Sequence, residues 1–189
     1  MNASMLKQAV YYLNDGLKQV GREVDAMEIV DIIQEHAVAT ALSAGASGAI
    51  AGVGGVIAMG IASASTIAMY GRLANAIGVR LGNGLIRALG SAVVADIAAA
   101  VTANLALSAA VSFIPGVGTM ASVALTGITN FCFVYMAGVI FLKLITALGV
   151  SRIETMSEAE LKSAAKNIQS NMDIKAAMKE AKKVYKEVG

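Results

Sequence analysis

Two long runs without charged side chains dominate the pattern of apolar and polar positions along the chain. Within its 189 residues, no Asp, Glu, Lys or Arg occurs at 37–71 or at 97–142. Each run exceeds the roughly 20 residues that one membrane-spanning helix needs, and each is interrupted near its centre by a glycine-rich segment. The pattern predicts an all-α fold of two antiparallel transmembrane helical hairpins, with four apolar helices at about 36–51, 56–72, 96–113 and 119–143.

The two interruptions have the composition of tight turns. They read GVGG at 52–55 and PGVG at 115–118. Proline cannot donate a hydrogen bond within a helix, and glycine adopts a positive φ at little cost. The predicted hairpin turns consist of Gly52, Gly54, Gly55, Pro115, Gly116 and Gly118.

The two predicted hairpins are also similar to each other in sequence. The segment IAGVGGVIA at 50–58 resembles IPGVGTMAS at 114–122, at an offset of 64 residues. We interpret this similarity as an ancient duplication. Coincidence in a chain rich in alanine and glycine is the alternative.

Charged residues are concentrated in two arms that flank the hairpins. Residues 1–35 carry three basic and six acidic side chains, and residues 150–189 carry eight and six. Both arms place apolar residues at steps of three and four, which is the pattern of amphipathic helices. We expect an acidic helical arm at 1–35, a duplicated hydrophobic domain at 36–150 and a basic helical arm at 151–189.

The C-terminal arm contains two helix signals. Ser157 and Glu160 match a capping box, and a second helix is predicted to begin near Asn171. Its apolar positions are Ile174, Met178, Ala181, Tyr185 and Val188. Lysine occupies most other positions, which suits a helix on an anionic membrane surface; a partner helix or packing on the rest of the protein fits equally well. The candidate membrane-surface residues are Lys175, Lys179, Lys182, Lys183 and Lys186.

The predicted apolar helices differ in how strongly they favour lipid. On an insertion scale the apolar residues of 119–143 contribute about −5 kcal/mol, whereas those of 36–51 contribute about −2 kcal/mol. The first helix therefore needs protein neighbours. Small residues four apart let helix backbones approach closely in lipid. We expect self-association through the small-residue positions Ala41, Gly45, Gly48, Gly60, Ala64 and Ala68.

Basic residues predict the orientation of the chain in a membrane. Arg72, Arg80 and Arg87 lie in the link between the hairpins, and Lys143 ends the fourth helix. The positive-inside rule places the link and both termini in the cytoplasm, with both turns across or deep within a bacterial inner (cytoplasmic) membrane. A tightly packed soluble bundle is the alternative, and the segment FCFVYMAGVIFL at 131–142 favours the membrane.

Polar residues within the uncharged runs and at their edge form two stripes. A spacing of four residues, or a multiple of four, keeps each stripe on one slowly winding helix face. Hydrogen bonding between helices is one interpretation, and the lining of a pore with Asp96 at its mouth is the other. We favour the first, because Asp96 could pair with an arginine of the link. The stripe residues are Asp96, Asn104, Ser108, Ser112, Ser122, Thr126 and Asn130.

Few residues could carry catalysis. His36 is the only histidine and Cys132 the only cysteine, and neither belongs to a catalytic or metal-binding motif. The glycine-rich segment at 45–55 lacks the Lys-Ser/Thr pair of a phosphate-binding loop. The net charge of +2 is too small to favour nucleic acid. We therefore predict a protein that is not an enzyme and that uses no cofactor, metal or nucleic acid.

Over roughly 36–150 the chain resembles a bacterial family of YcjF-like membrane proteins of unknown function, which also occurs behind certain GTPase domains. The resemblance lies in the segment IPGVGTMASVALTGITNFCFVYMAG and in IAGVGGVIAMGIASASTIAMYGRLANAIGV, which contains the Tyr70-Gly71 pair. Ala51 stands where the family usually has proline. The resemblance implies membrane integration, and any GTPase would have to be a separate chain.

The leading hypothesis is a non-enzymatic membrane protein that self-associates in the lipid bilayer as a homo-oligomer, serving as a scaffold or a GTPase-associated module. The alternative is a pore-forming toxin or secreted effector, which is carried in soluble form with an immunity or chaperone protein and inserts its hairpins later. A soluble helical partner of a GTPase is the third hypothesis.

Overall fold

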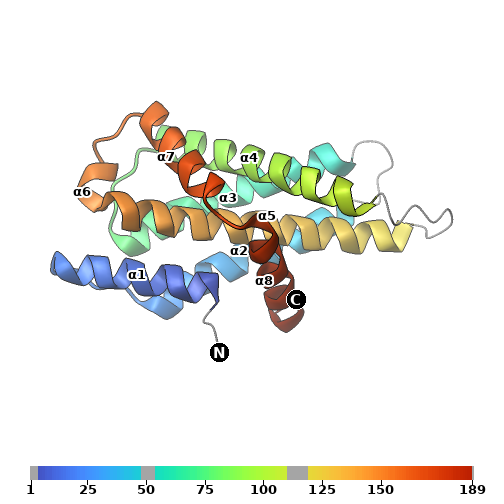
Figure 1. Cartoon of the computed structure of the whole chain (residues 1–189), viewed down its shortest axis with the longest axis horizontal. Helices are drawn as coiled ribbons and strands as arrows, with labels where there is room; N and C mark the ends of the chain where they lie inside the picture. The colour runs from blue at the N-terminus through green and yellow to red at the C-terminus, as the bar shows by residue number, and fades with distance from the viewer. Residues whose placement is uncertain (1–3, 48–53, 110–118, 189) are drawn as a thin grey trace.

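The protein is all-α in the part of the chain that its computed structural model describes, which is residues 4–47, 54–109 and 119–188. Within those ranges it has eight helices and no strand (Figure 1). They are α1 (Met5–Gln19), α2 (Ala26–Ser47), α3 (Gly54–Ile77), α4 (Asn83–Ala109), α5 (Thr119–Leu148), α6 (Val150–Ile153), α7 (Glu158–Ser170) and α8 (Ile174–Val188).

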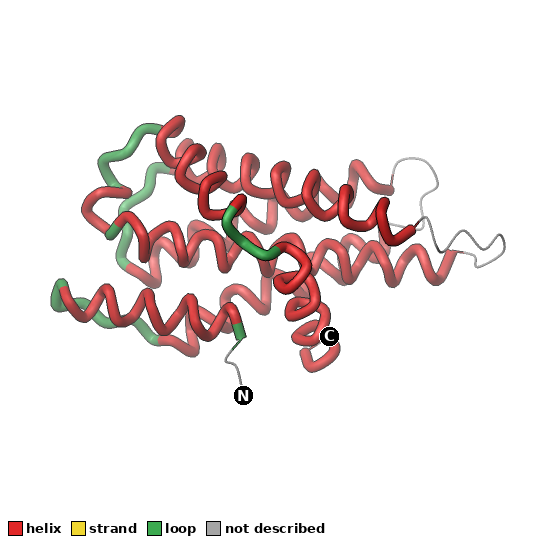
Figure 2. The backbone as a smooth tube through the Cα atoms, in the orientation of Figure 1, coloured by secondary structure: helices red, strands yellow, loops and turns green. Residues whose placement is uncertain are grey.

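The four long helices α2 to α5 form a bundle, and the short helices pack beside it (Figures 1 and 2). The bundle corresponds to the four predicted apolar helices, but two of them begin much earlier than expected. α2 begins at Ala26 instead of 36, and α4 begins at Asn83 instead of 96. The sequence prediction ends these helices at charged residues, but a charge on an outer helix face does not end a helix. In the structure Arg87 is exposed while Leu89 is buried, so α4 keeps its charge on a water-facing side.

The core of the protein is built around α5. Every residue from 131 to 142 is buried, as expected for a helix that is apolar on all sides. The ring of Tyr70 from α3 stacks on Phe141 with centroids 4.4 Å apart, and its hydroxyl donates to the carbonyl oxygen of Ala137 at 3.0 Å. On another side of α5, Tyr185 of α8 contacts Phe131 edge to face at 5.2 Å. A helix of the bundle and a helix of the C-terminal arm therefore both cover the most apolar segment of the chain.

Glycines on α5 and α4 allow neighbouring helices to approach closely. A Cβ atom on Gly138 would lie 2.8 Å from Cγ1 of Ile33 on α2, and one on Gly127 would lie 3.1 Å from the backbone oxygen of Ala41. A Cβ on Gly90 of α4 would lie 3.0 Å from Cγ1 of Ile67 on α3. Small residues thus bring helices of this chain together within one molecule.

The predicted helix signals of the C-terminal arm are present. Ser157 accepts from the amide of Glu160, and the Glu160 side chain accepts from the amide of Ser157, so the capping box at the start of α7 is confirmed. The second predicted helix begins at Ile174, three residues after the expected position.

The link between the hairpins is fixed by groups from distant segments. The amide of Arg80 donates to Oε1 of Glu154 at 2.7 Å, and Arg22 donates to the carbonyl oxygen of Gly78 at 3.2 Å. These contacts join the link to α6 and to the segment after α1. The link, α6 and the segment after α1, which are far apart in sequence, therefore meet at one end of the bundle.

We expect Gly138→Ala to lower the free energy of unfolding by about 1 kcal/mol. Overpacking against Ile33 costs about 1–3 kcal/mol, which exceeds the gain of about 1 kcal/mol in helix propensity. The matched control is Gly16→Ala in α1, where a Cβ meets nothing within 4 Å; it should raise stability by about 0.5–1 kcal/mol. Urea unfolding followed by circular dichroism measures both, and equal stabilisation by the two changes would contradict the close contact.

Candidate functional site: the charge-free end of the bundle

One end of the bundle carries no charged side chain. It consists of the C-terminal parts of α2 and α4 and the N-terminal parts of α3 and α5, and we call it the charge-free end. Its described residues are 37–47, 54–71, 97–109 and 119–130. Figure 1 shows these four helix ends projecting to the right, whereas α1, α6 and α7 lie beside the opposite end and α8 crosses the middle of α5. We call that opposite, charged end the base.

The charge-free end is large enough to penetrate deeply into a bilayer. At 1.5 Å per residue, its helical segments extend for about 16 Å in α2 and about 27 Å in α3. The hydrocarbon core of a bilayer is about 30 Å thick. The lengths therefore permit insertion over more than half of the bilayer before a charged side chain is reached.

A polar junction marks the boundary between the charge-free end and the base. Arg72 of α3 forms an ion pair with Glu35 of α2 at 2.7 Å. Next to this pair, Nδ1 of His36 lies 3.2 Å from the hydroxyl of Ser65, and Nε2 lies 3.5 Å from Arg72. The predicted antiparallel hairpin of 36–51 and 56–72 places His36 near Arg72, whereas the Glu35 partner of Arg72 is not among the sequence predictions.

Electrostatics at this junction favour the neutral form of His36. Partial burial lowers the pKa of His36 below its usual value, and the neighbouring Arg72 guanidinium lowers this pKa further. Glu35 acts in the opposite direction but is the smaller effect. A proton on His36 would therefore place a second cation beside Arg72.

Large apolar side chains are exposed at the charge-free end. Leu42 of α2 is 68% exposed, and Met59 of α3 is 42% exposed. Along the same helix Gly60, Ala64 and Ala68 are also exposed. A row of small residues with an open surface permits close approach of another helix.

The other predicted packing residues have different positions. Ala41 is buried against α5, so its small side chain serves contact within the chain. Gly45 lies in α2, and Gly48 lies outside the described residues.

The predicted turns lie mostly outside the described residues. These outlying turn residues are Gly52, Pro115, Gly116 and Gly118. Gly54 and Gly55, which also belong to the predicted turns, are the first two residues of α3.

The predicted polar stripe is described only at its two ends. Asp96 of α4 is half-buried and Asn130 of α5 is buried. Among the ion pairs of the described residues, Arg72 pairs with Glu35, and none joins Asp96 to an arginine. The structure does not describe the side chains of four other stripe residues, Asn104, Ser108, Ser122 and Thr126. Ser112 lies outside the described residues.

The C-terminal lysines are exposed, but the apolar face of their helix is covered. Lys175, Lys179, Lys182, Lys183 and Lys186 all lie on the water-facing side of α8. Ala177, Met178 and Ala181 are buried against the rest of the protein. In this structure, α8 packs on the rest of the protein, which is one of the three arrangements that its sequence pattern fits.

Two segments, instead of the four predicted, are long and apolar enough to cross a membrane among the described residues. They are Asn83–Ala100 and Gly127–Leu148. Of the second segment, 78% is buried inside the protein, and the core helix of a water-soluble domain has the same length and composition. The prediction of an all-α fold is confirmed for the described residues, whereas four separate spans are not found in them.

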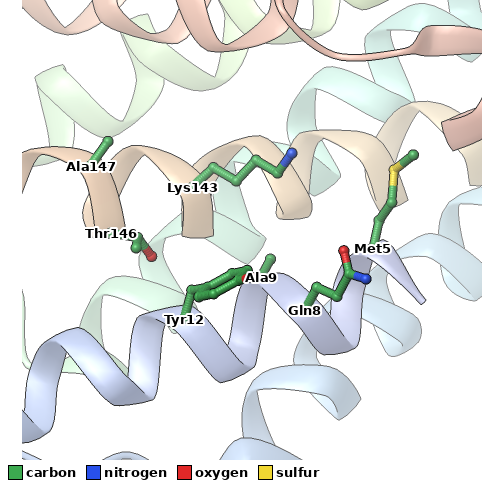
Figure 3. Close-up of a pocket in the computed structure, with 7 residues that line it drawn as sticks. All are labelled: Met5, Gln8, Ala9, Tyr12, Lys143, Thr146 and Ala147. Carbon is green, nitrogen blue, oxygen red and sulfur yellow. The ribbon is translucent and has the colours of Figure 1, made fainter. Parts of the chain in front are cut away.

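The N-terminal arm covers the base part of α5. A pocket of about 220 Å³ lies between α1 and α5 (Figure 3). Tyr12 and Met5 of α1 form one side, and Lys143 and Thr146 of α5 form the other. Lys143, predicted to end the fourth helix, lies beside α1, and α5 continues to Leu148.

The side chains that commonly bind metal ions are not clustered in the described part of the chain. No group of three or more His, Cys, Asp or Glu side chains is placed to hold a metal ion in these ranges. Cys132 is buried in α5, as expected for an inert thiol.

Comparisons with protein-family models, with curated proteins and with solved structures give no match for this chain.

We expect the stability of the protein to fall as the pH drops below about 6.5, the pKa of an unfolded histidine. Because the pKa of His36 is lowered in the folded state, the unfolded state binds the proton more tightly. The stabilisation is present above the unfolded pKa and is lost as the pH falls through the folded one. His36→Asn should flatten this part of the curve of unfolding free energy against pH. A variant curve parallel to that of the wild type would exclude the effect.

Proposed function

We propose that this protein is a non-enzymatic membrane protein whose charge-free end enters a lipid bilayer while its base remains in water. The observation that carries the proposal is the separation of charge along the bundle. No charged side chain of α2 to α5 lies within 37–71 or 97–142. The helices α1, α6 and α7 lie beside the base, and α8 crosses the middle of α5. Helices satisfy their own backbone hydrogen bonds, so the projecting helix ends can enter hydrocarbon.

The finer arrangement is part of the same proposal. The base carries Arg72, Arg80, Arg87 and Lys143, so the positive-inside rule favours a cytoplasmic base and cytoplasmic termini at a bacterial inner membrane. The two hairpins then enter the bilayer from the cytoplasmic side. The resemblance to YcjF-like membrane proteins supports this assignment, and a GTPase on a separate chain is the partner that it suggests.

Self-association is proposed through the exposed row on α3. Gly60, Ala64 and Ala68 leave the backbone of α3 accessible, and a second copy could approach there as closely as α2 approaches α5 at Gly127. In lipid, van der Waals packing of such small-residue faces drives helix association. The oligomer is therefore proposed to form through the charge-free end.

A charge placed at the charge-free end should prevent insertion. We expect Leu42→Lys to reduce binding to phospholipid vesicles by about tenfold or more, because a lysine within the hydrocarbon costs about 2.5–3.5 kcal/mol. The matched control is Met27→Lys on the same helix, since Met27 is 74% exposed at the base. Vesicle flotation gives the bound fraction for both variants. Equal binding by the two would contradict the assignment of the membrane-facing end.

A pore-forming effector is the second candidate function. The burial of Gly127–Leu148 by the other helices favours it, because a chain that travels through water before insertion must cover its most apolar segment. A chaperone or immunity protein would then be the partner, and Asp96 is the described candidate for the pore mouth.

Dye release separates the two candidates. We expect the purified protein to bind vesicles loaded with a fluorescent dye without releasing the dye, because a membrane anchor needs no aqueous path. Dye release that Asp96→Ala reduces would support the pore instead. Vesicles mixed with the Leu42→Lys variant provide the control for non-specific leakage.

A further inference from the structure

One carboxylate joins three helices near the middle of α5. Glu180 of α8 accepts hydrogen bonds from the amides of Met5 at 2.7 Å and Leu6 at 3.3 Å, which form the first turn of α1. It also accepts from the hydroxyl of Tyr135 on α5 at 2.8 Å. We call these three contacts the Glu180 latch.

The latch satisfies groups that have no other partner within their own helix. The first amides of a helix lack intrahelical acceptors, and a carboxylate near a helix N-terminus also interacts favourably with the helix dipole. In α1 the side chain of Ser4 accepts a hydrogen bond from the amide of Lys7, and Glu180 accepts those of the Met5 and Leu6 amides. Hydrogen bonds to a charged acceptor are stronger than neutral ones. The latch therefore couples the docking of α8 to the docking of α1.

The surface that α8 covers is the middle of α5. Tyr185 contacts Phe131, and Lys182 of α8 interacts electrostatically with the Cys132 thiol. Cys132 is 1% exposed in this arrangement. If α8 leaves, these α5 residues become accessible, and the apolar face of α8 also loses its cover.

A bilayer with anionic headgroups can replace α5 as the cover for α8. Its apolar face, which includes Ala177, Met178 and Ala181, suits the boundary between headgroups and acyl chains. Its five lysines are exposed and suit the anionic headgroups. Protein core and membrane surface thus compete for the same helix face.

We propose that α8 is a releasable membrane-binding helix, which the Glu180 latch holds on α5 while the protein is in water. The membrane half of this inference rests on the proposed function, whereas the latch itself does not. Anionic lipid is the occupant of the released apolar face. Release also frees the first turn of α1 and uncovers α5 for contact with the bilayer.

The single cysteine provides a test of the latch without lipid. We expect Glu180→Ala in the full chain to raise the rate at which a thiol reagent labels Cys132 by about tenfold or more, which corresponds to the loss of one charge-assisted hydrogen bond. The matched control is Glu187→Ala, which removes the same charge from the exposed side of α8. A Cys132 labelling rate in Glu180→Ala that lies within about twofold of the rate in Glu187→Ala would overturn the latch.

A second variant guards against loss of the fold. Tyr135→Phe removes one of the three hydrogen bonds and leaves the ring in place. It should give a smaller acceleration of labelling than Glu180→Ala, with an unchanged circular dichroism spectrum. If Cys132 of Tyr135→Phe is labelled as fast as in the protein unfolded in urea, labelling requires unfolding of the whole protein and not release of α8 alone. That result would contradict the proposal.

Vesicle binding then tests the proposed occupant. Glu180→Ala should bind vesicles that contain phosphatidylglycerol more tightly than the wild type does, with no gain on pure phosphatidylcholine. Changing Lys175, Lys179 and Lys182 to Gln in the same background should remove the gain. Faster Cys132 labelling without this gain overturns anionic lipid as the occupant. Failure of the proposed function is distinguishable, because it would appear as absent vesicle binding in the wild type and in the Met27→Lys control.

Discussion

The structure depends on keeping α5 away from water. Its residues 131–142 are apolar on every side and are all buried, and exposing such a surface to water is strongly unfavourable. The chain covers this segment with α2 and α3 from the bundle and with α1 and α8 from the arms. The amphipathic character of the arms follows from this role, because each must face α5 on one side and water on the other.

Small residues decide how closely that cover can approach. Gly138 accepts Ile33 and Gly127 accepts the backbone of α2 beside Ala41, so the interaxial contacts are set by positions without side chains. The same composition favours helix association in lipid, because van der Waals packing acts in both environments. Alanine and glycine rows therefore do not by themselves distinguish a membrane bundle from a protein core. In this structure Ala41 is buried against α5, whereas Gly60, Ala64 and Ala68 are exposed.

The arrangement has two different ends with a polar boundary. The Glu35–Arg72 pair and His36 lie where the uncharged parts of α2 and α3 begin. Towards the base, α1 and α8 are joined to α5 by Glu180. The cost of uncovering α5 is thus shared between apolar contact and hydrogen bonds from two arms, and a change at one arm is transmitted to the other.

The sequence by itself determined the all-α class, the four long apolar helices, the capping box at Ser157 and the segregation of charge, because these are local patterns. It misplaced the starts of α2 and α4, since a charge on the outer face of a helix is tolerated in water. Only the tertiary structure decided that 127–148 is enclosed by α2 and α3 together with helices of the arms, and that Glu180 meets Met5 across 175 positions of sequence. Periodicity identifies the face of a helix that must be covered, but the covering partner depends on contacts between distant segments.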